Sequence, residues 1–293
     1  MNAIVVLGAL HHDVVVDAPR MPELDETLPG ARVDYRFGGK GGNQALAAAR
    51  MGAQVAMAGR VGRDGAAETI RAAMDEAGVE HSLVLETDVP TGMSVAITLP
   101  SGEYGAVIVP GANLENDGNI SWREPPLAGL LQNEIPEAAN LAFASRLPPD
   151  SLLIANAAPA RRLPVGLAER IDVLIVNLVE AKGLTGHNNP ETALTALAGM
   201  VRGAVVLTRG AKGAILLENG QMTHHPAFSA KVVSTHGAGD MFTGALAARI
   251  TAGDLLQSAV RFAQAAAGLF VSSPISLRPR VTHAAVEAFL ARR

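Results

Sequence analysis

Short apolar runs alternate with Ala-rich, helix-like stretches along most of this chain. The runs are rich in Val, Ile, Leu and Ala, and they occupy residues 3–8, 54–59, 151–156, 172–177, 204–210 and 213–218. Runs of this length and composition are typical of buried strands, and runs that are apolar throughout fit a parallel sheet covered on both faces. The pattern therefore predicts strands that pack against other elements on both sides.

Helical patterns separate several of these strands. Residues 43–52 have an Asn near their start and a Gly at their end, and residues 66–77 stop at Gly78. Such residues are common start and stop signals of helices. Three more helices are expected at roughly 238–252, 255–271 and 282–291. Strands and helices that alternate at this spacing predict parallel βαβ units, and hence an α/β fold with helices on both faces of the sheet.

Two segments interrupt this rhythm. Val14–Phe37 and Gly92–Val109 have extended patterns with Pro, Gly and polar turn residues. We expect them to form a small antiparallel sheet that projects from the main one. Residues 117–126 are polar and include Pro125 and Pro126, which predicts a loop.

Composition narrows the classes of function. The 293 residues carry a net charge of −4 and no Lys/Arg-rich run, which argues against nucleic acids and anionic membranes as partners. There is no cysteine, so disulfides, thiolate metal sites and thiol catalysis are excluded. The chain has no run of 18 apolar residues, and no basic leader precedes its first apolar run. A cytoplasmic protein is therefore expected.

One stretch that suggests chemistry is STHGAGDMFTG, residues 234–244. Gly237, Ala238 and Gly239 stand before a helical pattern, and a helix N-terminus with little side-chain bulk can bind an anion such as phosphate. Asp240 would repel that anion, but it could accept a proton from a hydroxyl group that attacks a phosphate. The alternative interpretation is that Asp240 is simply an N-cap.

A second Gly-rich stretch is FGGKGGNQALAAARMG, residues 37–52. Lys40 and Asn43 could donate hydrogen bonds to hydroxyl or phosphate oxygens, and the alternative is a turn with a solvated lysine. The stretch is not a Walker loop, because Gly41 stands where Ser or Thr is required. The first stretch is not a dinucleotide fingerprint either, because Phe242 replaces the third glycine.

Together, the two motifs resemble those of the ribokinase-like (phosphofructokinase-B type) carbohydrate kinases. GGKGGNQA (38–45) and THGAGDMFTG (235–244) occur in the family's order, roughly 200 residues apart, and the resemblance covers nearly the whole chain. It implies one domain, 1–293, with a doubly wound, mostly parallel sheet and a small β-sheet lid at about 12–37 and 92–109. It also implies transfer of the γ-phosphoryl group of ATP, with Mg²⁺, to a sugar hydroxyl.

The resemblance assigns roles to residues of the two glycine-rich stretches and their surroundings. Asp240 would be the catalytic base, and Gly237, Ala238 and Gly239 would form the anion hole. The residues at the family's sugar-contacting positions are Asp13, Gly39, Lys40, Asn43 and Glu134. Carboxylates and amides suit this role because they can fix several sugar hydroxyls at once, although a single Asp or Glu is more often a surface or capping residue.

The resemblance also implies the nucleotide and metal sites. NLVE (177–180) matches an element associated with metal and phosphate, so Asn177 and Glu180 are the candidate Mg²⁺ ligands, partly through water. Mg²⁺ keeps several waters, so one carboxylate and the ATP oxygens suffice. The expected nucleotide contacts are Asn177, Thr208, Gly210, Gly237 and Gly239. Polar pairs three residues apart near a helix start also occur without any ligand.

Three departures from the family pattern bear on cation and substrate. Ser234 stands where Asp is usual in the potassium-site loop, and residues 272–281 lack the usual Gly-containing loop, so potassium activation is expected to be weak or absent. His11 replaces an Asn in the sugar segment; it either changes which sugar fits or is a structural histidine. Residues 117–126 are shorter than the usual helical segment.

We therefore expect an ATP- and Mg²⁺-dependent kinase that phosphorylates a pentose, with ribose first. The same chemistry on deoxyribose, a hexose, a nucleoside or pseudouridine is the alternative. A non-catalytic sugar-binding regulator is a further one, which the intact Asp240, Asn177 and Glu180 disfavour. The resemblance also allows a homodimer that pairs through the lid.

Overall fold

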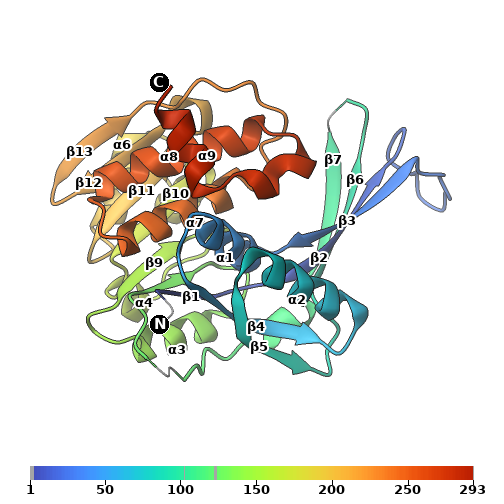
Figure 1. The fold of residues 1–293 in the computed structure, drawn as a ribbon, viewed down its shortest axis with the longest axis horizontal. Helices are drawn as coiled ribbons and strands as arrows, with labels where there is room; N and C mark the ends of the chain where they lie inside the picture. Colours follow the sequence, from blue (N-terminus) through green and yellow to red (C-terminus); the bar gives the residue numbers. More distant parts are fainter. Residues whose placement is uncertain (1–2, 102, 122–123, 293) are drawn as a thin grey trace.

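A nine-stranded sheet forms the centre of the computed structural model, which describes residues 3–101, 103–121 and 124–292 (Figure 1). Its strand order is β13-β12-β11-β10-β9-β8-β1-β4-β5. The strands are β1 (Ile4–Leu7), β4 (Val55–Gly62), β5 (Glu80–Thr87), β8 (Ala128–Leu131), β9 (Leu152–Asn156), β10 (Val173–Asn177), β11 (Ala204–Thr208), β12 (Ala214–Glu218) and β13 (Gln221–His225). Neighbours from β5 to β11 pair in parallel, whereas β12 and β13 pair antiparallel.

Helices cover both faces of this sheet. One layer contains α1 (Lys40–Arg50), α2 (Gly65–Ala77), α7 (Ala238–Thr251), α8 (Leu256–Ser272) and α9 (His283–Leu290), and the other contains α3 (Glu137–Arg146), α4 (Val165–Ala168), α5 (Leu178–Thr185) and α6 (Pro190–Ala198). Strand side chains alternate between the layers, since Ile4 and Val6 face the first core and Val5 and Leu7 the second. The predicted fold class is confirmed. Within the described residues, no helix is both long and apolar enough to cross a membrane.

The antiparallel edge pair was not predicted. Asn219 and Gly220 connect β12 to β13, and both have positive φ angles, 51° and 75°. An Asn-Gly turn of this kind suits a two-residue hairpin, so the signal was present in the sequence. The described part of 117–126 contains no helix or strand, as expected, and residues 122–123 lie outside the described residues.

A second sheet projects from the body of the molecule (Figure 1). It contains β3 (Arg32–Gly38), β2 (His11–Asp17), β6 (Met93–Thr98) and β7 (Tyr104–Val109), in that order. The prediction of a purely antiparallel sheet was wrong, because β2 and β6 pair in parallel. These two strands enter the sheet from the same side, since each follows a strand of the central sheet. His11 and Asp13 therefore belong to the small sheet.

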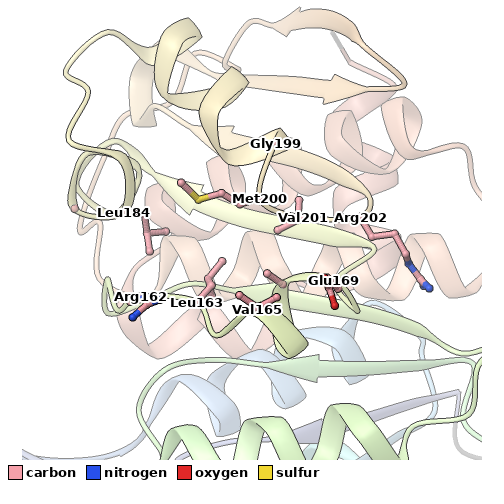
Figure 2. A pocket seen from close by; sticks show the side chains of 11 residues that line it. Arg162, Leu163, Val165, Glu169, Leu184, Gly199, Met200, Val201 and Arg202 are labelled. Atoms are coloured by element: carbon pink, nitrogen blue, oxygen red, sulfur yellow. The ribbon is translucent and has the colours of Figure 1, made fainter.

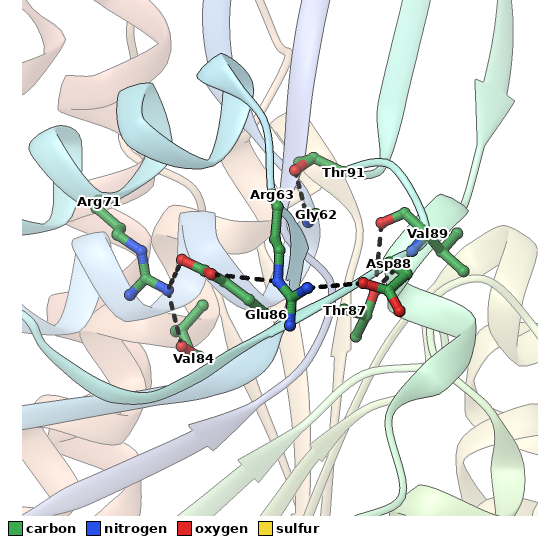
Figure 3. A network of polar contacts seen from close by, with 9 residues as sticks. All are labelled: Gly62, Arg63, Arg71, Val84, Glu86, Thr87, Asp88, Val89 and Thr91. Atoms are coloured by element: carbon green, nitrogen blue, oxygen red, sulfur yellow. Dashed lines mark hydrogen bonds and ion pairs between the residues drawn. The ribbon is translucent and has the colours of Figure 1, made fainter.

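The entry of β6 into the small sheet is fixed at one corner of the molecule (Figure 3). The Thr91 hydroxyl accepts a hydrogen bond from the Gly62 amide at 2.8 Å and donates one to Asp64 at 2.7 Å. Asp64 also caps α2 by accepting from the Ala67 amide at 3.0 Å. Arg63 lies between the exposed carboxylates of Glu86 and Asp88 in the same corner; ion pairs this exposed contribute little to stability. Asp64 thus connects a core helix to the start of the small sheet.

Close packing of α1 and α7 places side chains of both helices at one point. A Cβ atom on Gly244 would lie 2.5 Å from the carbonyl oxygen of Gln44 and 2.6 Å from the Cβ of Ala47. Only glycine allows this approach. Residue 240 lies one turn before Gly244 on the same face of α7. Side chains from the start of α1 can therefore reach Asp240.

Candidate active site

The N-terminus of α7 is open, as the sequence suggested. Gly237 is the N-cap residue with φ 77°, a left-handed conformation that favours glycine, and no side chain of the described residues caps this helix end. A Cβ atom placed on Gly239 would meet no atom of the described part of the chain within 4 Å. The backbone amides of this first turn carry the positive end of the helix dipole, so the arrangement suits an anion.

Asp240 lies in the first turn of α7, and its side chain points to α1 instead of capping its own helix. The N-cap interpretation is therefore wrong. The carboxylate is 8% exposed and accepts hydrogen bonds from Gln44 Nε2 at 3.0 Å and Asn43 Nδ2 at 3.3 Å. Burial raises the pKa of Asp240 above its ordinary value, although the charge of Lys40 and the two amide donors oppose the shift. A carboxylate in this environment is a stronger base than an exposed one.

Gln44 is a site residue that the sequence reasoning missed. It is fully buried, and its Nε2 donates to Asp240 and also to Asn156 Oδ1 at 3.1 Å. Its Oε1 accepts from Gln132 Nε2 at 2.8 Å, which fixes the amide orientation. A glutamine on the buried face of an Ala-rich helix is the signal that could have identified it. These bonds hold the carboxylate of Asp240 in one position.

Lys40 lies among three carboxylates. Burial lowers the pKa of Lys40, but the negative charges of Asp240, Glu134 and Glu180 outweigh it, so the pKa is raised overall. The lysine is therefore protonated at neutral pH. Its backbone amide donates to Glu134 Oε2 at 2.7 Å, and burial raises the pKa of Glu134 against the opposing effects of that bond and of the lysine charge. A protonated ammonium group at this position can neutralise further negative charge brought by a ligand.

Two of the predicted sugar residues, Asp13 and His11, belong to the small sheet and lie near Glu134 and Lys40. Asp13 Oδ1 is buried with no hydrogen-bond partner among the described residues. Burial raises the pKa of Asp13 to about 6, although the charge of Arg36 opposes this. His11 is 4% exposed, and burial, with a smaller effect from Lys40, lowers its pKa to about 4, so it is neutral at pH 7. An unpartnered acceptor beside a neutral imidazole suits uncharged hydroxyl groups. Gly39 completes this side as the N-cap residue of α1.

Asn177 and Glu180 contact each other at the start of α5. The Asn177 Oδ1 accepts from the Glu180 amide at 2.9 Å, and the Glu180 carboxylate accepts from the amide and side chain of Asn177 at 2.8 and 2.9 Å. This is a capping box, which is the alternative that the sequence left open. Burial raises the pKa of Glu180, whereas the Asn177 bond and Lys40 lower it. The charge of Glu180 thus acts on Lys40 and Asp240 as well as on its own helix.

A cavity of about 610 Å³ opens beside the first turn of α7. Ala238, Gly239, Thr208 and Gly210 line it with mostly small side chains from α8 and from residues 227–235. Asp240 does not line this cavity, because its side chain points toward Asn43 and Gln44 of α1. A larger pocket of about 880 Å³ lies elsewhere, with Arg162 and Arg202 at opposite ends (Figure 2). None of the predicted site residues lines that pocket.

Residues 1–279 match the pfkB family of carbohydrate kinases. The ribokinase of Lactococcus lactis is 33% identical over 279 residues, which cover 92% of this chain and 91% of the relative. The ribokinase of Haemophilus influenzae is 31% identical, with 92% of each chain covered. The structure of Arabidopsis thaliana ribokinase complexed with ribose and ATP is similar over 99% of both chains, with a TM-score of 0.91 and 28% identity.

Proposed function

Because the chain belongs to the pfkB family of carbohydrate kinases, we propose that it transfers the γ-phosphoryl group of ATP to a hydroxyl of ribose. One observation carries this proposal: the buried, hydrogen-bonded carboxylate of Asp240 lies in the uncapped first turn of a helix, with protonated Lys40 beside it. A base, an anion site and a cation at one point are what phosphoryl transfer to an alcohol requires.

Ribose is proposed as the acceptor because of the groups on the Lys40 side of α7. Asp13 offers an unpaired oxygen, and Glu134 and Asn43 add a carboxylate and an amide. Relatives that cover most of this chain include the ribokinases of Lactococcus lactis and Haemophilus influenzae, and one solved relative is a ribokinase complexed with ribose. The buried, neutral His11 adds bulk beside Asp13, so it is the residue that would select among pentoses.

ATP is proposed to occupy the cavity on the other side of the first turn of α7. Thr208 and Gly210 would contact the nucleotide, and the amides of Gly237, Ala238 and Gly239 would receive the γ-phosphoryl group. Asp240 would take the proton of the attacking hydroxyl as the oxygen–phosphorus bond forms. Its hydrogen bonds to Gln44 and Asn43 keep it aimed at that hydroxyl.

Magnesium is part of this proposal, and the residues fit it. No group of three or more His, Cys, Asp or Glu side chains in the described part of the chain could hold a metal alone. Mg²⁺ needs only one or two carboxylates besides waters and phosphate oxygens, and Glu180, whose pKa is raised by burial, would supply one. Bound Mg²⁺ would neutralise charge on the phosphate oxygens. Asn177 would orient Glu180 through the capping box.

We also propose that residues 1–293 act as one domain whose small sheet is the lid over the sugar, with lid segments at about 12–37 and 92–109. The lid carries Asp13 and His11, so its position decides whether the sugar site is complete. Use of ATP supports the expected cytoplasmic location.

A homodimer through the lid is the proposed assembly. Strand register places Tyr35, Val14, Val95 and Val107 in one row across the small sheet. Tyr35 and Val107 are 65% and 67% exposed. An open apolar face is often covered by another protein surface, and a second copy of the same sheet provides one of matching character.

The direct test is ADP release from ATP and Mg²⁺ with ribose, deoxyribose, hexoses and nucleosides in parallel. Ribose is expected to give the highest kcat/KM, and Asp240→Asn should lower kcat roughly 10²–10⁴-fold. Asp150→Asn, at an exposed position, is the matched control. Near-full activity of Asp240→Asn would exclude the proposed base. Sugar binding without ADP release would favour the regulator instead.

A further inference from the structure

Residues 233–237 form the loop that leads into α7. A buried arginine, Arg278 of η3 (Ile275–Arg280), binds the backbone of this loop. Arg278 is 7% exposed. Its Nη2 donates to the Ser234 carbonyl at 2.6 Å and its Nη1 to the His236 carbonyl at 2.8 Å. The fork of one guanidinium group therefore clamps two alternate carbonyl groups of the loop.

The same loop is fixed by the end of α8. The carbonyl oxygen of Val271 accepts from the amides of Val233 and Ser234 at 2.8 and 3.3 Å. The Arg278 guanidinium stacks 4.3 Å above the ring of Phe270, and a Cβ on Gly237 would lie 3.3 Å from that ring. Phe270 is thus packed between the arginine and the loop, which leaves the loop little freedom to move.

The clamp determines where the loop amides point. In a trans peptide the carbonyl and the following N–H point in opposite directions. When Arg278 draws the carbonyls of Ser234 and His236 toward itself, the N–H groups of Thr235 and Gly237 are turned away from it. Thr235 lines the 610 Å³ cavity, as does Ala238 directly after Gly237. The arginine therefore orients the peptides that lead into the anion site.

We propose that Arg278 is a positioning residue for phosphoryl transfer and serves as a built-in cation that replaces a bound monovalent ion. The proposal rests on the proposed function. Converging carbonyl oxygens are the ligands of potassium, and here a guanidinium group already occupies them. An arginine is charged at any physiological pH and does not dissociate, so the loop is ordered without potassium. The weak or absent potassium activation expected from Ser234 and residues 272–281 thereby acquires a structural cause.

The test compares Arg278→Ala, Arg278→Lys and Arg280→Ala. Arg280 lies on the same short helix but is exposed, so its substitution is the matched control. Arg278→Ala should lower kcat about tenfold to a hundredfold with little change in the KM for the sugar, because the sugar residues lie on other elements. Guanidinium chloride at low concentration should restore part of kcat, and Arg278→Lys should retain an intermediate kcat. Wild-type kcat should not change when potassium chloride is replaced by tetramethylammonium chloride.

Amide hydrogen exchange of residues 233–241 measures how firmly Arg278 holds the loop, and it does not depend on catalytic activity. Exchange should accelerate in Arg278→Ala and slow again with guanidinium ion, and this holds even if no sugar proves to be a substrate. Unchanged exchange and kcat in Arg278→Ala would overturn the proposal. The proposal would also be overturned if kcat fell, guanidinium ion did not restore it, and the KM for the sugar rose by the same factor. An inactive wild-type enzyme with the expected exchange pattern would instead overturn the proposed function alone.

Discussion

The buried carboxylate of Asp13 should lower the free energy of unfolding but help to bind the sugar. Its pKa is raised to about 6 in the folded chain against an ordinary value of 3.8, chiefly by burial. The folded state therefore holds the proton more tightly than the unfolded state, and stability is lost as pH rises through 6. We expect Asp13→Asn to raise the free energy of unfolding by about 1–2 kcal/mol at pH 8 and by much less at pH 4. Urea denaturation at both pH values measures this.

The same substitution should weaken sugar binding. Asp13→Asn is expected to raise the KM for ribose, because the amide offers one acceptor where the carboxylate offers two. Asp150→Asn, an exposed change, should alter neither stability nor KM. Equal stabilisation of Asp13→Asn at pH 4 and pH 8 would show that the charge of Asp13 is not the cause.

Gln44 provides a second test at the residue scale. Its Nε2 donates to Asp240 Oδ1 at 3.0 Å, and a donor to a carboxylate favours the charged form. Gln44→Leu removes this donor, so the pKa of Asp240 should rise further and the acid limb of the kcat–pH profile should move to higher pH. Gln257→Leu, on an exposed part of α8, is the control. An unmoved acid limb would argue that Asp240 does not determine it.

The sequence identified the chemical groups of the candidate site better than the groups that hold them. Asp240 and Lys40 stand in unusual glycine-rich surroundings, so their positions could be predicted. Gln44 and Arg278 could not be recognised in this way. Arg278 meets Ser234 across 44 residues, so the contact depends on the tertiary fold and leaves no local signal in the sequence.

At the scale of elements, six of the nine strands described in the central sheet were predicted, because β1, β4, β9, β10, β11 and β12 are short apolar runs. The other three were not predicted, since β5 and β13 are largely polar and β8 has only four residues. The pairing of β2 with β6 was not predicted either, since strand direction in the small sheet depends on how each chain segment leaves the central sheet. The Asn219–Gly220 hairpin shows the opposite case, in which a local signal was present but outweighed by the expectation of βαβ units.

Asp64 links two elements, and its loss should affect both. It caps α2 and accepts from the amide and hydroxyl of Thr91, where the chain enters the small sheet. Burial raises its pKa, but these hydrogen bonds outweigh it and leave the pKa lowered, so its stabilisation is present at neutral pH and lost in acid. Asp64→Ala should reduce the free energy of unfolding by about 1–2 kcal/mol. Faster amide exchange in β6 should accompany this loss; Asp150→Ala, which should show neither effect, is the control.

At the scale of the whole molecule, the candidate site lies where the two sheets meet. Strand alternation gives the small sheet one face with Asp13, Arg36 and Ser94 in register and another with Val14, Tyr35 and Val95 in register. The first face carries residues assigned to the sugar, and the second is apolar and open. One sheet can therefore close a site and carry an interface at the same time.

The apolar, open face of the small sheet predicts that the protein is a homodimer. The protein should have twice the mass of one 30.2 kDa chain in light scattering, and Val107→Glu should reduce it to that of a single chain. Val107 is 67% exposed on the edge strand β7, so a charge there should not unfold the chain but would be buried in the interface. Leu24→Glu, at a position 96% exposed and outside the strands, should leave the mass doubled. A wild-type mass of one chain would remove the dimer, and a doubled mass in Val107→Glu would place the interface elsewhere.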